Sequence, residues 1–254
     1  MAGATATAFN SSQFEAIYPE GVERHYWNRC RNQVILDALQ RIGDPGQILE
    51  IGCGKGLVVA YLRSRGFLVT GVELADVRPI PGLQDHVRTN KNALALDPAE
   101  RRGVKTILLL DVIEHLEDPS AFLKQLKGGF PSLQQLVITV PARQELFSNY
   151  DAFNGHYRRY DLPVLEVHMA GAGFRIVRAS YFFHALYPAA RALLMLSKAR
   201  KEGFTVPAKG LPSTLHRLLG TLFLWEYKIL PSAWPGSSII ANVEVQPGSD
   251  PRHG

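Results

Sequence analysis

Cysteine is scarce in this sequence of 254 residues, which contains only Cys30 and Cys53. Two cysteines do not form the disulfide framework of a small secreted domain. No spacing of Cys and His residues in the chain is typical of a zinc site, and we predict no metal ligands. We therefore expect both thiols to be reduced.

Long apolar runs are also missing. No stretch reaches the about 18 uninterrupted apolar residues that a transmembrane helix needs. Residues 1–9 are mostly small, and they lack the basic start of a signal peptide. We expect a cytoplasmic protein, which lies at a membrane surface only if the basic segment described below binds lipid.

The charge of the chain is mildly basic, with a net charge of +5 and a pI of about 9.2. This excess is compatible with nucleic acid, an anionic membrane or an ordinary solvated surface. Basic and aromatic residues are interleaved only over residues 156–160, so we expect no nucleic-acid partner. The hydrophobic share of 46% and the charged share of 20% are typical of a globular α/β domain.

Short apolar segments alternate with helical patterns from residue 47 onward. Strands are expected near 47–52, 68–73, 86–90, 105–111, 135–140, 174–182 and 238–246, and helices near 13–42, 56–65, 119–128 and 161–171. This alternation predicts a parallel sheet with helices on both faces. Residues 1–12 are expected to be disordered.

Residues 184–236 interrupt the alternation. They predict two apolar helices, about 186–200 and 213–230, separated by a segment with several glycines and prolines. Basic residues outnumber acids there, and Trp225 lies among apolar residues near Lys228. This composition fits a lid over an acceptor, a peripheral membrane contact or a dimer face, and the oligomeric state stays open.

The most informative segment is 48–56, which reads Ile-Leu-Glu-Ile-Gly-Cys-Gly-Lys-Gly. A buried strand is followed there by three glycines, whose backbone can adopt positive φ and let a ligand approach closely. A helix from Leu57 and a second strand that ends at Glu73 come next. The order strand, glycine turn, helix, strand and acid is the layout of a nucleoside-binding unit.

Two residues indicate which nucleoside binds. A dinucleotide fingerprint has its last glycine where this chain has Leu57. The carboxylate of Glu50 would repel a pyrophosphate and favour a cationic ligand. S-adenosylmethionine has no phosphate and carries a positively charged sulfur, so the residues favour it over NAD.

Several motifs resemble those of class I S-adenosylmethionine-dependent methyltransferases. Residues 50–56 look like their first motif. Residues 111–119, Asp-Val-Ile-Glu-His-Leu-Glu-Asp-Pro, resemble the motif that ends strand four in the branch that includes the ubiquinone-biosynthesis O-methyltransferases. Residues 154–174 are similar to a segment of that branch, and 238–246 fit the last strand of the family.

The resemblance implies a Rossmann-like, seven-stranded, mostly parallel sheet with helices on both faces and an antiparallel last strand. We divide the chain accordingly into four parts. Residues 1–45 form a helical segment that covers the donor site, 46–183 the donor-binding core, 184–236 a helical insertion, and 237–254 the last strand and tail.

The resemblance also implies donor-binding roles. Glu73 accepts hydrogen bonds from the ribose hydroxyls. Asn92 stands near the place of a family acid that meets adenine, and its carbonyl can still accept from the adenine amino group. Asp111 either lines the donor site or caps the turn after strand four. The predicted donor-binding residues are Glu50, Gly52, Cys53, Gly54, Gly56, Glu73, Leu74, Asn92, Ala93, Asp111, Tyr26, Trp27 and Arg31.

Two histidines are candidate bases for an acceptor hydroxyl, His115 and His156. For His115, packing under the donor site is the alternative. The segment after His156 supplies the predicted acceptor-binding residues Tyr157, Arg158, Arg159 and Tyr160. The two arginines either bind a carboxylate or phosphate of the acceptor or pair with acids such as Asp151 and hold the loop closed.

These observations predict an S-adenosylmethionine-dependent methyltransferase. It acts on a small or amphipathic acceptor, lipid-linked in one version of the hypothesis, by direct in-line displacement, and the product is S-adenosylhomocysteine. O-methylation is the expected reaction. The alternatives are a non-catalytic protein that binds the donor or a partner on the same fold, and an NAD-dependent oxidoreductase.

Overall fold

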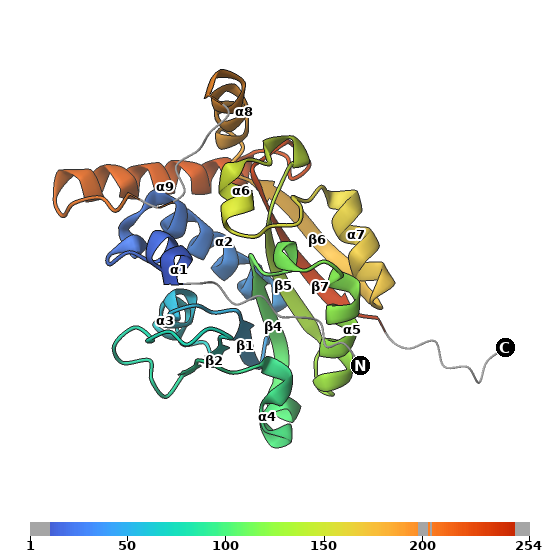
Figure 1. Ribbon diagram of the computed structural model, residues 1–254. Coiled ribbons are helices and arrows are strands. Elements are labelled where there is room, and N and C mark those ends of the chain that lie inside the picture. The colour runs from blue at the N-terminus through green and yellow to red at the C-terminus, as the bar shows by residue number, and fades with distance from the viewer. Residues whose placement is uncertain (1–10, 198–202, 204, 247–254) are drawn as a thin grey trace.

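A computed structural model describes residues 11–197, 203 and 205–246. Its centre is a seven-stranded sheet in the order β3-β2-β1-β4-β5-β7-β6 (Figure 1). The strands are β1 Gln47–Ile51, β2 Val69–Val72, β3 Val87–Arg88, β4 Val104–Leu110, β5 Gln135–Pro141, β6 Phe174–Phe182 and β7 Ser238–Val245. β7 runs antiparallel to both of its neighbours, β5 and β6, and all the other neighbouring pairs in this sheet are parallel. The predicted fold class is therefore confirmed.

Helices and short 3-10 turns connect the strands. The α-helices are α1 Ser11–Ile17, α2 Tyr26–Ile42, α3 Leu57–Arg63, α4 Pro98–Gly103, α5 Pro119–Gly129, α6 Asn149–Phe153, α7 Leu162–Gly171, α8 Leu186–Ser197 and α9 Leu211–Ile229. The 3-10 turns are Val22–Arg24, Ala93–Ala95, Ile113–His115 and Gln144–Leu146. None of these helices is long and apolar enough to cross a membrane.

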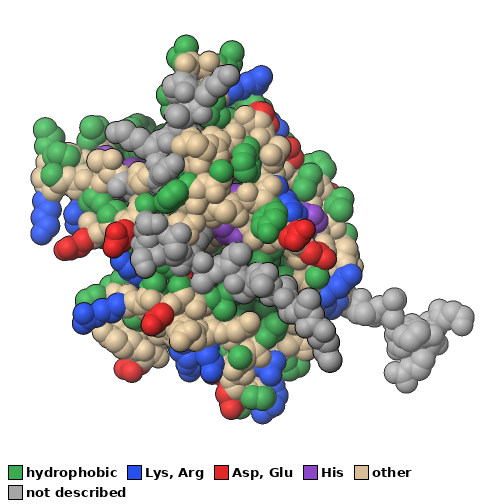
Figure 2. Space-filling view, viewed as in Figure 1, with side chains coloured by type: hydrophobic (Ala, Val, Ile, Leu, Met, Phe, Trp, Pro, Cys, Tyr) green, Lys and Arg blue, Asp and Glu red, His purple; other side chains and the backbone are tan. Residues whose placement is uncertain are grey.

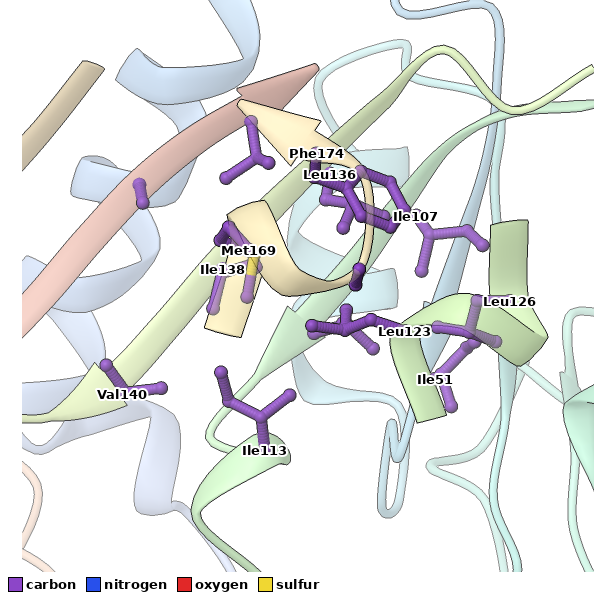
Figure 3. Close-up of a cluster of buried hydrophobic side chains, with 14 of the residues drawn as sticks. Ile51, Ile107, Ile113, Leu123, Leu126, Leu136, Ile138, Val140, Met169 and Phe174 are labelled. Carbon is purple, nitrogen blue, oxygen red and sulfur yellow. The ribbon is translucent and has the colours of Figure 1, made fainter. Parts of the chain in front are cut away.

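The sheet has a hydrophobic core on each face, because successive side chains of a strand point to opposite sides. In β4, Ile107 and Leu109 face the core that α5 and α7 cover, where Leu123 and Met169 meet them (Figure 3). Leu108 and Leu110 of the same strand face the second core, which α2, α3 and α9 cover. Burial of each such side chain stabilises the fold by about 1.5–3 kcal/mol.

Helix α9 packs on α2 and thereby belongs to the second core (Figure 1). The helices cross closely at Gly220, where an added Cβ would lie 3.2 Å from the carbonyl oxygen of Tyr26. The Tyr227 hydroxyl donates to Asp37 at 3.2 Å. Glu226 accepts from the backbone N–H groups of His184 and Ala185 at the start of the segment that leads into α8. The segment between β6 and β7 is thus anchored to the sheet.

The predicted helix 13–42 is wrong as a single element. It breaks after α1, where Pro19 has no N–H to donate and Gly21 adopts a φ of 82°. Ser11 and Ser12 lie in α1 and not in a disordered segment. The prediction of disorder for residues 1–10 lies outside the described residues.

Other boundaries also differ from the sequence prediction. The third strand contains only Val87 and Arg88 instead of 86–90. The fourth ends at Leu110 because Asp111 adopts a φ of 59°, which turns the chain out of the sheet. Helices α4 and α6 were not predicted, because each is shorter than two turns and gives little periodic signal.

We expect Gly71→Ala to destabilise the fold. Gly71 lies in β2, and an added Cβ would be 2.6 Å from Cys53 Sγ and 2.9 Å from Cys53 Cβ. Overpacking of this kind costs about 1–3 kcal/mol, and urea denaturation would measure it. Gly128→Ala is the matched control, since nothing lies within 4 Å of its added Cβ. Alanine at position 128 should leave the stability unchanged or raise it, because Gly128 lies in helix α5 and alanine favours a helix more than glycine does. Equal stability of the two variants would contradict this view of the β2 packing.

Candidate functional site

A cavity of about 370 Å³ opens at the edge of the sheet where β1, β2 and β4 end. Side chains of α1, α2 and α8 line it as well as the strand ends. Figure 2 shows histidine side chains near the middle of the face that it presents. The cavity therefore lies where parallel α/β sheets bind ligands.

The glycine turn forms one wall of the cavity. Gly52 and Gly54 have φ angles of 72° and 55°, which favour glycine. Gly54 donates its backbone N–H to Glu73 Oε2 at 2.9 Å, and Ala75 donates to Glu73 Oε1 at 2.9 Å. An added Cβ on Gly54 would lie 2.5 Å from the Tyr18 hydroxyl. Tyr18 thus packs against the turn at a place that a side chain on residue 54 would fill.

A buried carboxyl group, Glu50, lies beneath this turn. Its Oε2 atom has no hydrogen-bond partner among the described residues. Burial raises the pKa of Glu50 to about 8, an effect that Arg31 opposes and Glu73 reinforces. A positively charged group placed in the cavity would therefore favour the ionised form of Glu50.

Helix α2 extends a guanidinium to the end of β4. Arg31 Nη2 lies 2.6 Å from Asp111 Oδ2, and Thr139 donates to Asp111 Oδ1 at 3.2 Å. The Arg31 guanidinium carbon also lies 5.1 Å from the centre of the Trp27 ring. Its Nε atom is buried without a partner among the described residues. The side chain of Asp111 thus lines the cavity, and its backbone turns the chain out of the sheet after β4.

The two candidate bases meet on the opposite side. The rings of His115 and His156 have centroids 4.6 Å apart and an interplanar angle of 78°. His156 Nδ1 lies 2.9 Å from Asp151 Oδ1, so the remaining ring nitrogen is available to the cavity. Burial lowers the pKa of His115 to about 4, and His156 adds to this effect.

Asp151 organises this side of the cavity. Its side chain is fully buried, and it accepts from Arg159 Nε at 2.8 Å and from the Ser148 backbone N–H at 2.9 Å. Burial by itself would raise the pKa of Asp151, but the hydrogen bond from His156 and the charge and hydrogen bond of Arg159 outweigh it and lower the pKa. The carboxylate therefore stays ionised and orients His156.

The predicted acceptor-binding segment has mixed surroundings. Arg159 lines the cavity but pairs with Asp151. This pairing corresponds to the second role considered for the arginines, in which they hold the loop closed. Arg158 donates to the Glu117 carbonyl oxygen at 2.8 Å, outside the cavity lining. Tyr160 is fully buried and donates to the Ile113 carbonyl oxygen at 3.3 Å. Tyr157 is half exposed.

The predicted donor-binding residues fall into two groups, those that line the cavity and those that lie outside it. Those that line the cavity are Tyr26, Trp27, Arg31, Glu50, Gly52, Cys53, Gly54, Glu73 and Asp111. Leu74, Asn92 and Ala93 lie outside the lining, and Asn92 Oδ1 accepts from Leu94 at 2.9 Å. Gly56 packs instead, since its Cβ would lie 2.7 Å from Val87.

Sequence reasoning missed seven cavity residues that carry polar side chains: Tyr18, Asn28, Glu114, Tyr150, Asn154, Ser237 and Ser238. Glu114 is fully buried, and neither carboxylate oxygen has a hydrogen-bond partner among the described residues. Burial and the nearby Asp111 raise its pKa well above the ordinary value. Its position three residues after Asp111 and next to His115 was the available signal.

Comparisons with known proteins support the assignment of this chain to the methyltransferases. A family model described as a methyltransferase domain matches residues 23–179, which is more than half of the chain. The ubiquinone biosynthesis O-methyltransferase of Rickettsia typhi is 31% identical over 110 residues, which are 40% of this chain and 45% of that protein. The mitochondrial enzyme of the same name from Arabidopsis thaliana is 33% identical over 93 residues, 32% of this chain and 28% of that protein. The chain thus spans less than half the length of these relatives.

A solved structure shares the fold over nearly the whole chain. The magnesium protoporphyrin IX methyltransferase of Synechocystis, crystallised with S-adenosylhomocysteine, superposes with a TM-score of 0.55 at 14% identity. The match covers 93% of this chain and 95% of that one.

We expect Arg159→Met to destabilise the protein by about 3–5 kcal/mol, since it removes the cation beside the buried Asp151 carboxylate. Chemical denaturation would measure the loss. Arg158→Met is the matched control. This half-buried side chain bonds the Glu117 carbonyl oxygen and lies beside Tyr160, but it neutralises no buried carboxylate, so a loss of about 1 kcal/mol or less is expected. A similar, small loss in both variants would refute the structural role of Arg159.

Proposed function

The chain belongs to the family of methyltransferase domains, and we propose that it transfers a methyl group from S-adenosylmethionine to a hydroxyl oxygen of a small or amphipathic acceptor. One observation carries this proposal. A single cavity joins the glycine turn, Glu73 and the Arg31–Asp111 pair on one side to the Asp151–His156 pair on the other.

The donor side suits a cationic nucleoside. Glu73 is fixed by two backbone N–H groups, yet a carboxylate accepts about four hydrogen bonds and can also accept from ribose hydroxyls. The unpartnered Arg31 Nε is a donor for a carboxylate of the ligand, and Glu50 favours a positive charge nearby. Bound there, S-adenosylmethionine supplies a methyl group on a positively charged sulfur.

The acceptor side suits removal of a proton. With Nδ1 held by Asp151, the other ring nitrogen of His156 can accept the hydroxyl proton. The acceptor oxygen then bonds to the methyl carbon while the carbon–sulfur bond breaks and its electron pair returns to sulfur. Tyr26 and Trp27 cover the cavity and exclude water, and their alternative role is helix packing.

The parts of the chain take distinct roles in this proposal. Residues 1–45 cover the donor, which agrees with the presence of Phe14, Ile17 and Tyr18 in the cavity wall. Residues 46–183 bind the donor, and β7, within the part 237–254, completes the sheet. The insertion 184–236 borders the acceptor, since Leu186, Ala189 and Leu193 of α8 line the cavity.

Two other functions remain as alternatives. A protein that binds the donor or a partner without turnover would use the same cavity walls, and the Asp151–His156 pair favours turnover over it. An NAD-dependent oxidoreductase is disfavoured, because Glu50 lies under the turn that would hold the pyrophosphate.

The exposed face of α9 supports a lipid-linked acceptor and a peripheral membrane contact. Its outward side chains recur every three or four residues and are 54–82% exposed: Leu211, Leu215, Leu218, Leu222, Trp225 and Ile229. Hydrophobic side chains cover the amino-terminal end of α9 and the tip of α8 in Figure 2. The exposed charges of this helix are the basic Arg217 and Lys228, which favour an anionic surface over a second copy of the same face.

Substitution of Glu73 and His156 should separate donor binding from turnover. Glu73→Ala should weaken S-adenosylhomocysteine binding about tenfold or more, because charge-assisted hydrogen bonds are lost. His156→Ala should leave that affinity nearly unchanged and abolish methyl transfer to an acceptor pool. Calorimetric titration measures the first effect, with NADH as a negative control.

Asp85→Ala, an exposed carboxylate after the same strand, is the matched control for Glu73→Ala. Circular dichroism checks that each variant is folded. Equal losses of donor affinity in the Glu73 and His156 variants would refute this division of roles.

Leu218→Glu combined with Leu222→Glu should reduce retention on phosphatidylglycerol–phosphatidylcholine vesicles by about tenfold or more, since two exposed apolar contacts are replaced by acids. Sedimentation with vesicles measures this. Val167→Glu, on the exposed side of α7, is the control and should bind as the parent does. Retention that is unaffected by the α9 pair would exclude α9 as the membrane contact.

A further inference from the structure

We infer that Glu114, His115 and His156 form a binding site for a divalent transition-metal ion, which would hold and activate the acceptor oxygen. This inference rests on the proposed function, because it concerns the acceptor side of the same cavity. One potential ligand atom from each residue lies within 4.8 Å of the others. No other group of three such side chains is found among the residues that the structure describes.

Glu114 gives the first reason. It is fully buried, and both carboxylate oxygens have no hydrogen-bond partner among the described residues. An uncompensated buried carboxylate is costly. The nearest guanidinium groups bond elsewhere, since Arg31 pairs with Asp111 and Arg159 with Asp151. A cation at the carboxylate would provide the missing partner.

The surroundings of His156 give the second reason. A histidine that binds a metal through one ring nitrogen usually donates the other N–H to a carboxylate, which fixes the ring. Asp151 occupies this position at 2.9 Å from His156 Nδ1, and it is held in turn by Arg159 and Ser148. Asp151 therefore orients His156 through Nδ1 alone, and the second ring nitrogen, Nε2, takes no part in this contact.

The ligands also come from two segments that are tied together. Tyr157 donates its backbone N–H to the Glu114 carbonyl oxygen at 2.8 Å, which joins the 3-10 turn after β4 to the segment after α6. Ligand atoms about 2.1 Å from one tetrahedral ion lie about 3.4 Å apart. The three ligand atoms now lie within 4.8 Å of one another, so they must move closer together to bind one ion. The Glu114 carboxylate can do so, because no hydrogen bond from the described residues holds it in place.

The ligand types indicate the kind of ion. Two imidazoles and one carboxylate suit Zn²⁺, Mn²⁺ or Co²⁺ better than Mg²⁺, which prefers oxygen ligands. Three protein ligands leave at least one coordination position for an acceptor oxygen. A hydroxyl bound to such an ion loses its proton more readily, as water does on zinc. In this arrangement the ion takes the place of His156 as the group that activates the hydroxyl. The ring nitrogen of His156 that Asp151 does not hold would bind the ion, and the acceptor proton would leave to solvent.

Metal binding by untagged, chelator-treated protein tests the inference directly. The parent protein should bind one equivalent of Zn²⁺ or Mn²⁺ by calorimetry, and Co²⁺ should give a visible absorption spectrum of bound ion. Glu114→Gln keeps the size of the side chain and should weaken binding at least about tenfold. Glu117→Gln, which changes an exposed acid two residues after that 3-10 turn, is the matched control and should bind as the parent does.

A second variant, His156→Gln, covers the case that Glu114→Gln does not fold. Folded parent protein that binds S-adenosylhomocysteine but none of the three ions would overturn the metal site and leave the proposed function intact. Ion binding that survives in both folded variants would place the ion elsewhere and also overturn it. Protein that fails to bind S-adenosylhomocysteine would instead refute the proposed function, whatever its metal content.

Discussion

Strands β2, β1, β4 and β5 run parallel, so they end at the same edge of the sheet. This constraint brings the glycine turn, Glu73 and Asp111 to one cavity, although they are far apart in the sequence. Their positions are fixed by packing, because Leu109 and Leu110 enter cores on opposite faces of the sheet. A slip of one residue in β4 would exchange those faces and remove Asp111 from Arg31.

The cavity contains buried acids with two kinds of surroundings. Glu73 and Asp151 accept several hydrogen bonds each, and they hold backbone and side chains in place. Glu50 and Glu114 keep carboxylate oxygens that have no hydrogen-bond partner in the part of the chain that the structure describes. A buried polar group without a partner is unfavourable, so these two acids gain the most when a positively charged group enters. The acids with partners therefore hold the walls of the site in place, and the acids without partners are the positions at which a cationic group would be stabilised most.

Local features of the sequence were sufficient for much of this structure. Apolar runs predicted every strand of the described sheet, and the glycines of 52–56 predicted the turn, because both signals depend on adjacent residues. The partner of Arg159 was not decided by the sequence, since it depends on the short helix α6 that presents Asp151. The burial of Glu114 depends on the 3-10 turn after β4 and on contacts with distant segments. Such contacts arise from tertiary packing and leave no periodic pattern.

The position of α8 connects the reaction proposed for the cavity to the surface proposed for membrane contact. Leu193 lines the cavity and is also 47% exposed, while Met195 and Leu196 at the end of the helix are exposed further. An amphipathic acceptor with its hydroxyl near His156 would therefore have apolar side chains along its path out of the cavity. The exposed face of α9 is anchored through Gly220 and Tyr227 to α2, which also carries Arg31. One helix, α2, thus supports both the donor side of the cavity and the apolar face, so a membrane bound at α9 would be connected to the cavity through α2.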